Sequence, residues 1–121
     1  MQPAPRPSNE AARLEALRQR AVLDTPPEAA FDDLTTLAAH ICDAPMATIT
    51  LVDEDRQWFK SRLGIAPKET SRAIGFCPHT ILHTDLMVVP DALEDIRFAD
   101  GLDTKVAPGQ TISLLPAVAG G

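Results

Sequence analysis

The feature that most constrains the fold is the stretch from Ala47 to Gly64, which reads ATITLVDEDRQWFKSRLG. Ala47, Ile49 and Leu51 fall on one face of an extended segment, which is the period-two pattern of a strand with one buried side. A short polar turn, residues 53–56, follows this strand, and a second strand then returns. The stretch therefore predicts a β-hairpin that belongs to a larger sheet.

The returning strand carries two aromatic side chains on opposite faces. Phe59 shares one face with Leu63, whereas Trp58 shares the other with Lys60 and Arg62. Because indole, lysine and arginine side chains combine an apolar body with a polar tip, the face of Trp58 is expected to line a wet or ligand-facing surface.

A first helix is predicted ahead of the hairpin. Asn9 can cap a helix that runs through about Arg20, and Leu14, Leu17 and Ala21 recur at helical spacing. This narrow stripe leaves two interpretations open. The helix packs on the sheet as part of the core, or it forms a two-helix seam with another subunit.

A second helix is predicted to begin at Pro26, because Thr25 and Glu28 form a capping-box pattern and proline is favoured at the first helical position. Its apolar stripe consists of Phe31, Leu34, Leu37, Ala38 and Ile41. So wide a stripe is typical of a helix packed on a sheet. Asp32 and Asp33 fall outside the stripe and are expected to stay hydrated.

Two short segments complete the expected layout. Residues 86–89, LMVV, form a continuous apolar run, as expected of a central strand that is buried on both faces. Asp91 with Glu94 then offers a capping pattern for one or two helical turns. Ile96 and Phe98 are expected to close over the sheet or the rim of a pocket.

Length and charge narrow the classes of function. At 121 residues the chain is expected to form a single module. It carries 17 acidic and 11 basic side chains, with a net charge of −6 and no basic cluster, so nucleic acid is not an expected partner. We see no membrane-spanning run and no signal peptide, so a cytoplasmic location is predicted. Residues 1–8, with three prolines, are expected to be a flexible tail.

Cysteine and histidine side chains are the candidates for chemistry. Cys77, His79 and His83 lie in one short segment, and His40 and Cys42 lie near the end of the second helix. Zinc accepts such ligands. However, the chain has no CxxC pair, and a closed site would require the helix end to meet a distant loop, so no metal site is predicted.

Cys77 itself allows two interpretations. Pro78 can start a helical turn, which would place Cys77 close to exposed backbone N–H groups that favour a thiolate and therefore redox sensing. In the structural interpretation, which we prefer, Phe76 and Ile81 pack in the core and Cys77 is half buried.

Four segments, LDTPPEAAFDDL, LVDEDRQWFKSRLG, FCPHTIL and VVPDALEDIRFAD, follow one another in the chain. In this order and spacing they resemble the GAF domains that open many bacterial sensor histidine kinases and diguanylate cyclases, over roughly residues 9–100. The resemblance implies an α+β fold with a central antiparallel sheet, helices on one face and a pocket of loops and short helices on the other. It also implies a module that receives signals or dimerises in a two-component or cyclic di-GMP protein and is not an enzyme.

The resemblance points to Trp58, Phe76, Cys77 and His79 as residues that border a pocket for an unidentified small ligand. The residues around Cys77 do not match a bilin-binding signature, so a bilin is not expected. One alternative is a GAF-type free methionine sulfoxide reductase, which needs a second cysteine in reach, and Cys42 is poorly placed for that role. Another alternative is a ligand-free scaffold that dimerises through the first helix.

The resemblance ends at about Gly101. Residues 101–121 contain no aromatic side chain, and a single short strand, Thr111 to Leu115, is expected between Pro108 and Pro116. A sheet without its later strands would leave one edge unpaired and the apolar face of the second helix partly uncovered. We therefore interpret the chain as a truncated or frame-altered member of the family.

Overall fold

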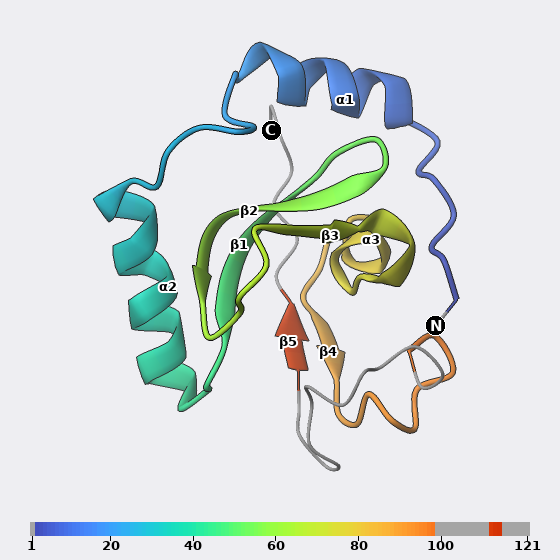
Figure 1. Ribbon diagram of the computed structural model, residues 1–121. Coiled ribbons are helices and arrows are strands. Elements are labelled where there is room, and N and C mark those ends of the chain that lie inside the picture. The colour runs from blue at the N-terminus through green and yellow to red at the C-terminus, as the bar shows by residue number, and fades with distance from the viewer. Residues whose placement is uncertain (1, 99–111, 115–121) are drawn as a thin grey trace.

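A computed structural model describes residues 2–98 and 112–114 of the chain (Figure 1). The elements are α1 (Glu10–Gln19), α2 (Ala29–Cys42), β1 (Ala47–Val52), β2 (Arg56–Leu63), β3 (Glu69–Ser71), the 3-10 helix η1 (Arg72–Ile74), α3 (Cys77–Thr80), β4 (Met87–Val89) and β5 (Ile112–Leu114). Helices pack around antiparallel strands, which confirms the predicted α+β fold class.

The predicted hairpin is present as β1 and β2, and β3 extends it into an antiparallel sheet of order β1-β2-β3. Ile49 pairs with Ser61, but the next residue of β1, Thr50, pairs with Phe59. Lys60 is therefore an extra residue in β2, as in a β-bulge. Because of this bulge, Lys60 and Ser61 both reach toward α2, and the strict alternation that the sequence predicts stops at Phe59.

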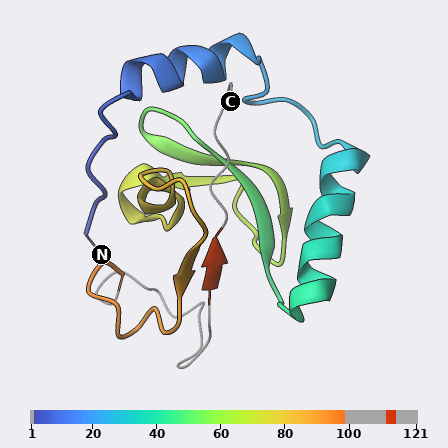
Figure 2. The same cartoon turned by 180° about the vertical axis from the view of Figure 1, so that it is seen from behind.

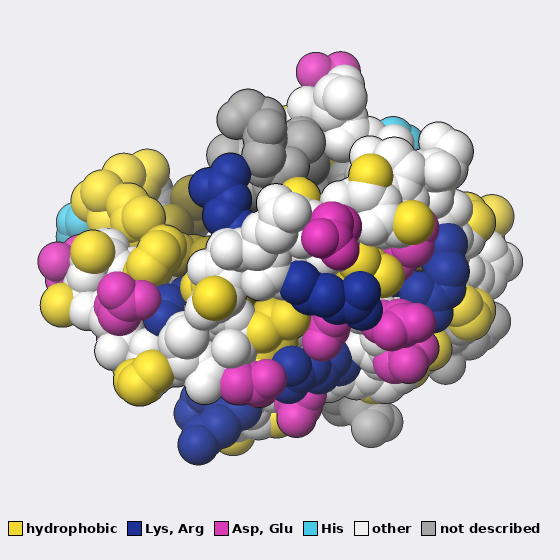
Figure 3. Space-filling model, turned by 90° about the horizontal axis from the view of Figure 1, so that it is seen from above, with side chains coloured by type: hydrophobic (Ala, Val, Ile, Leu, Met, Phe, Trp, Pro, Cys, Tyr) yellow, Lys and Arg dark blue, Asp and Glu magenta, His cyan; other side chains and the backbone are white. Residues whose placement is uncertain are grey.

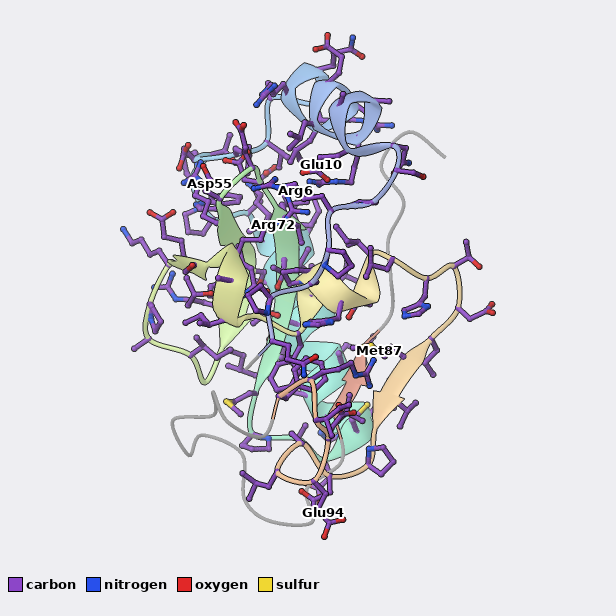
Figure 4. All side chains as sticks on the ribbon, turned by 90° about the vertical axis from the view of Figure 1, so that its right-hand side faces the viewer. Arg6, Glu10, Asp55, Arg72, Met87 and Glu94 are labelled. Carbon is purple, nitrogen blue, oxygen red and sulfur yellow. The ribbon has the colours of Figure 1, made fainter. Side chains whose placement is uncertain are left out.

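Helices lie on both sides of this sheet. Seen from the side, α3 lies in front of the strands and α2 behind them (Figure 4). α1 crosses the end of the hairpin, as the two opposite views show (Figures 1 and 2), and Arg13 of α1 donates a hydrogen bond to the carbonyl of Val52. Leu14 and Leu17 are buried within the chain itself, which supports the first of the two interpretations, that this helix packs as part of the core.

α2 begins later than the capping pattern predicts. The hydroxyl of Thr25 donates to the carbonyl of Val22, 2.5 Å away, and so does not cap the helix. Glu28 occupies the N-cap position without a capping hydrogen bond from its side chain. At the other end, Asp43 adopts the left-handed conformation, with φ of 49°, and terminates the helix.

α2 turns a polar side toward the sheet. Thr35 and Ala39 are buried against the strands, and the carboxylate of Asp32 accepts a 2.6 Å hydrogen bond from Ser61. The large apolar side chains that point outward are Leu34, Leu37 and Ile41, with exposed fractions of 56%, 53% and 71%. The predicted packing of the apolar stripe on the sheet is therefore wrong for these three side chains, whereas the expectation that this face is partly uncovered is confirmed. Asp32 is engaged rather than simply hydrated.

The hydrophobic core lies on the other side, around α3 and β4. Its main cluster consists of Met87, Val89, Ala92 and Phe98, with the partly buried Phe76 packed against it, and the other buried apolar side chains of the described residues are Leu14, Leu17, Ala39, Val52 and Trp58. Ile96 and Phe98 are both predicted to close over the sheet or the rim of a pocket; Phe98 is fully buried, but the prediction is wrong for Ile96, which is 77% exposed.

β4 differs from the central strand that its apolar run predicts. Val88 is exposed, and within the described residues β4 pairs with β5 alone. The prediction of a short strand between Thr111 and Leu115 is confirmed by β5, and the remainder of residues 101–121 lies outside the described part of the chain.

Candidate functional site

Three of the four residues predicted to border a pocket lie together at α3. Phe76 precedes the helix, and Cys77 and His79 belong to its single turn. The ring of Phe98 lies 4.5 Å from that of Phe76 and 5.0 Å from that of His79, in an edge-on contact with the imidazole. Phe98 is fully buried and His79 is 7% exposed, so these side chains pack closely against one another.

The N-terminal segment, residues 2–8, closes the same region from outside (Figure 1). Nε2 of His79 donates to the carbonyl oxygen of Gln2 over 2.9 Å, and the amide of Gln2 donates to the carbonyl of Arg97 over 2.9 Å. These hydrogen bonds give the segment defined contacts next to α3. Its flexibility stays a prediction.

Cys77 is half buried, as in the structural interpretation of its sequence. Burial raises the pKa of its thiol, and a hydrogen bond with the side chain of Thr50 opposes this only in part. An activated thiolate at Cys77 is therefore not supported. Cys42 lies at the exposed C-terminal end of α2, behind the sheet that separates α2 from α3.

Trp58, the fourth predicted residue, does not join the other three. The side chain of Gln57 points at Gly75, next to α3, so closely that a Cβ on Gly75 would lie 2.0 Å from Nε2 of Gln57. Because adjacent side chains of a strand alternate, Trp58 faces the opposite side, with Lys60. Trp58 is 7% exposed, so the wet surface predicted for this face is wrong.

Lys60 is held in a polar cage at the start of α2. Its ammonium group donates to the hydroxyl of Thr25 over 2.7 Å and to the carbonyl of Pro26 over 2.8 Å, and it forms a 2.6 Å ion pair with Glu28. It also lies 5.5 Å from the centre of the Phe31 ring. The sequence pattern does not predict this cage, because Thr25 and Glu28 indicate a capping box instead.

A second polar cluster joins α1 to η1 and to the hairpin turn. The carboxylate of Glu10 accepts hydrogen bonds from Arg72 and Arg13, and Arg72 also donates to the carbonyl of Asp53 over 3.0 Å. Burial tends to raise the pKa of Glu10, but the two arginines outweigh it and hold this pKa at about 2. Glu10 therefore stays ionised and links three elements.

A surface hollow of about 320 Å³ lies beside this cluster, where Arg6, Glu10, Asp55 and Arg72 come close together (Figure 4). Its lining residues are Pro3, Ala4, Arg6, Asp55, Ser71, Arg72 and Ala73. Arg6 pairs with Glu10 and Asp55, each over 3.2 Å. Because carboxylates already neutralise both arginines, the hollow is a polar indentation rather than a site for an anion.

Another hollow, of about 510 Å³, is formed by the loop and strand of residues 82–88. None of the four predicted pocket residues lines either hollow. Within residues 2–98 and 112–114, no three His, Cys, Asp or Glu side chains are grouped closely enough to hold a metal ion. No helix in this described part is long and apolar enough to cross a membrane.

No protein-family model matches the chain. A stretch of 96 residues, 79% of this chain, is 31% identical to a protein named cyclic di-GMP phosphodiesterase from Pseudomonas aeruginosa and covers 16% of that protein. A urease accessory protein UreG from Streptomyces griseus is 36% identical over 74 residues, which are 56% of the chain and 29% of that protein. The sulfur carrier protein CysO of Mycobacterium tuberculosis is 57% identical over 28 residues, 23% of the chain and 30% of that protein. The chain thus spans less than a third of each of these relatives.

Proposed function

We propose that the chain is a non-catalytic sensory module of the GAF type in a bacterial, cytoplasmic signalling protein that handles cyclic di-GMP. The observation that carries the proposal is the similarity of 79% of the chain to 16% of a cyclic di-GMP phosphodiesterase. A match to so small a part of an enzyme fits an accessory segment of that enzyme. The segment order behind the GAF resemblance and the helix-backed antiparallel sheet support the same class.

In this proposal the signal acts at α3. The residues expected to bind a ligand are covered by Phe98 and by the N-terminal segment, so a small ligand has to displace Gln2 from His79 and Arg97. Two hydrogen bonds contribute about 0.5–1.5 kcal/mol each. A sensory switch needs two states that differ by a few kcal/mol, which matches this amount.

The alternative of a methionine sulfoxide reductase receives less support. Its chemistry starts from a thiolate, and burial raises the pKa of Cys77. Its second cysteine would be Cys42, which lies on the helix behind the sheet. A scaffold built on Leu14 and Leu17 is also disfavoured, because both side chains are buried in the chain itself.

The proposal is tested with a chimera of the Pseudomonas phosphodiesterase in which this chain replaces the aligned stretch. The isolated chain is expected not to hydrolyse cyclic di-GMP, whereas the chimera hydrolyses it. His79→Gln, which disturbs the contact with Gln2, is expected to change the rate of the chimera about fivefold. The matched control is His83→Gln, because His83 is exposed on the following loop and should leave the rate unchanged.

Two results would contradict this assignment. Hydrolysis of cyclic di-GMP by the isolated chain would make it an enzyme. Equal rates for the chimera and its His79→Gln variant, with the fold of both verified by circular dichroism, would mean that α3 carries no signal.

A further inference from the structure

The outer face of α2 is an apolar stripe exposed to solvent, whereas α1 and α3 both bury side chains against the rest of the chain. Leu34, Leu37 and Ile41 are spaced at one and two turns along it, and each is more than half exposed. The space-filling view shows hydrophobic side chains gathered at the left-hand end of the molecule, where α2 lies (Figure 3). A contiguous apolar patch of this kind is typical of a surface that binds another protein.

The charges beside this stripe indicate what binds there. Asp33 and His40 are both exposed, and neither takes part in the ion pairs of the described residues. At 100° per residue they lie on the same flank of the stripe, with Asp33 near the N-terminal end and His40 near the C-terminal end. The flank therefore carries an acidic group at one end and a basic or hydrogen-bond-donating group at the other.

A twofold axis that runs across α2, close to Leu37, brings a second α2 face to face in antiparallel orientation. This operation places the same flank of both helices together but reverses its direction, so each Asp33 faces the His40 of the other copy. A parallel pairing would instead bring opposite flanks together and separate these groups. Charge complementarity thus selects one occupant and one orientation.

We propose that α2 is the interface of an antiparallel homodimer in which Leu34, Leu37 and Ile41 pack against the same residues of a second copy. This proposal does not depend on the sensory function. A helix of 14 residues is about 21 Å long, so the pair buries less than the roughly 800 Å² per partner of a standard interface. The dimer is accordingly weak, and its population depends on protein concentration.

The first experiment measures the mass of the full chain by sedimentation velocity over a wide range of concentration. We expect a reversible monomer–dimer equilibrium. Leu37→Glu is expected to raise the dissociation constant about tenfold or more, because it places two carboxylates at the centre of the apolar contact. The matched control is Leu86→Glu, since Leu86 has an exposed fraction of 54%, close to the 53% of Leu37, and lies outside α2.

The second experiment tests the orientation. His40→Asp sets a second carboxylate against the Asp33 of the other copy and is expected to weaken the dimer about two- to fivefold. Adding Asp33→Lys to this variant creates an opposite-charge pair at both ends and is expected to restore the affinity. Unfolding curves of all variants establish that the monomer itself remains folded.

Several outcomes would overturn the proposal. The first is that the chain stays a monomer at every concentration, which would leave the stripe to another protein. The second is that Leu37→Glu and Leu86→Glu weaken the dimer equally. Masses that grow without limit would point to open-ended assembly. A dimer that is insensitive to His40→Asp, or is not rescued by the second substitution, would exclude the antiparallel arrangement.

Discussion

The two sides of the β1-β2-β3 sheet differ in how their helices contact it: apolar rings dominate at α3, whereas hydrogen bonds and an ion pair accompany the buried Trp58 and Ala39 on the side of α2. On the α3 side, Phe98 contacts the rings of Phe76 and His79 in a core closed by apolar side chains. On the α2 side, the contacts nearest the strands are polar, with Lys60 in its cage and Ser61 bonded to Asp32. Hydrogen bonds and an ion pair thus help to position α2, and its side chains Leu34, Leu37 and Ile41 remain available for another surface.

The comparison is tested first at the centre of the apolar side. Phe98→Ala is expected to lower the free energy of unfolding by about 3–5 kcal/mol, because the ring is fully buried and its loss leaves a cavity. The measurement is urea unfolding followed by circular dichroism. Ile96→Ala is the control, and its 77% exposed side chain should change stability by no more than about 0.5 kcal/mol. Equal effects of both variants would mean that the core is not where the structure places it.

The polar side is tested at Lys60. Lys60→Ala is expected to lower the free energy of unfolding by about 2–3 kcal/mol, because Thr25, Pro26 and Glu28 lose the ammonium group that they share. Lys60→Met keeps the volume of the side chain but removes its charge, so it separates the two contributions. It should lower the free energy of unfolding by less than Lys60→Ala does. The exposed Lys68 supplies the control, and a cost for Lys68→Ala as large as for Lys60→Ala would contradict the cage.

Acid should weaken the polar contacts before it affects the apolar core. The folded-state pKa of Glu10 is lowered from 4.5 to about 2, so its contribution is complete above pH 4.5 and is lost as the pH falls toward 2. Glu10→Gln is expected to cost about 1–2 kcal/mol at neutral pH and to flatten the loss of stability over this range. Unfolding curves recorded at a series of pH values check this, and parallel profiles for the variant and the wild type would refute it.

The smallest effect is expected on the outer face of α2. Leu34→Ala should change the free energy of unfolding of the monomer by no more than about 0.5 kcal/mol, because Leu34 already faces solvent. Dilute protein, kept well below the concentration at which it associates, is required for this measurement. A loss of about 2–5 kcal/mol would show that the stripe packs on the sheet after all, and the contrast between the two sides would disappear.

The sequence predicts the helices and strands themselves better than it predicts which of their faces pack against the sheet. The alternation in β1 and the polar turn specify a hairpin. Asn9 occupies the N-cap position of α1 as predicted, but its side chain makes no capping hydrogen bond. The period of the α2 stripe shows which side chains share a face but not what covers that face. For this reason the pattern predicts that Leu34 packs on the sheet, although it is exposed. The bulge at Lys60 depends on hydrogen-bond register, which local pattern does not encode.

The residues of the candidate site were likewise predicted only in part. Proximity in the chain correctly suggested that Phe76, Cys77 and His79 share one region. The pattern places Trp58 on an amphipathic face, but an amphipathic face need not be wet, and here both Trp58 and Lys60 are buried. The contact of His79 with Gln2 joins residues from distant parts of the chain, and such tertiary contacts leave no periodic signal in a single sequence.

The hydrogen bond from the amide of Gln2 to the carbonyl of Arg97 joins the N-terminal segment to the turn that immediately precedes Phe98. A tag or tether joined to the N-terminus would transmit a pulling force to Gln2. Mechanical tension applied there would act on the Gln2 contacts one after another, as in peeling, before it reached any strand pair. The leading segment is therefore expected to be released while the hairpin stays intact.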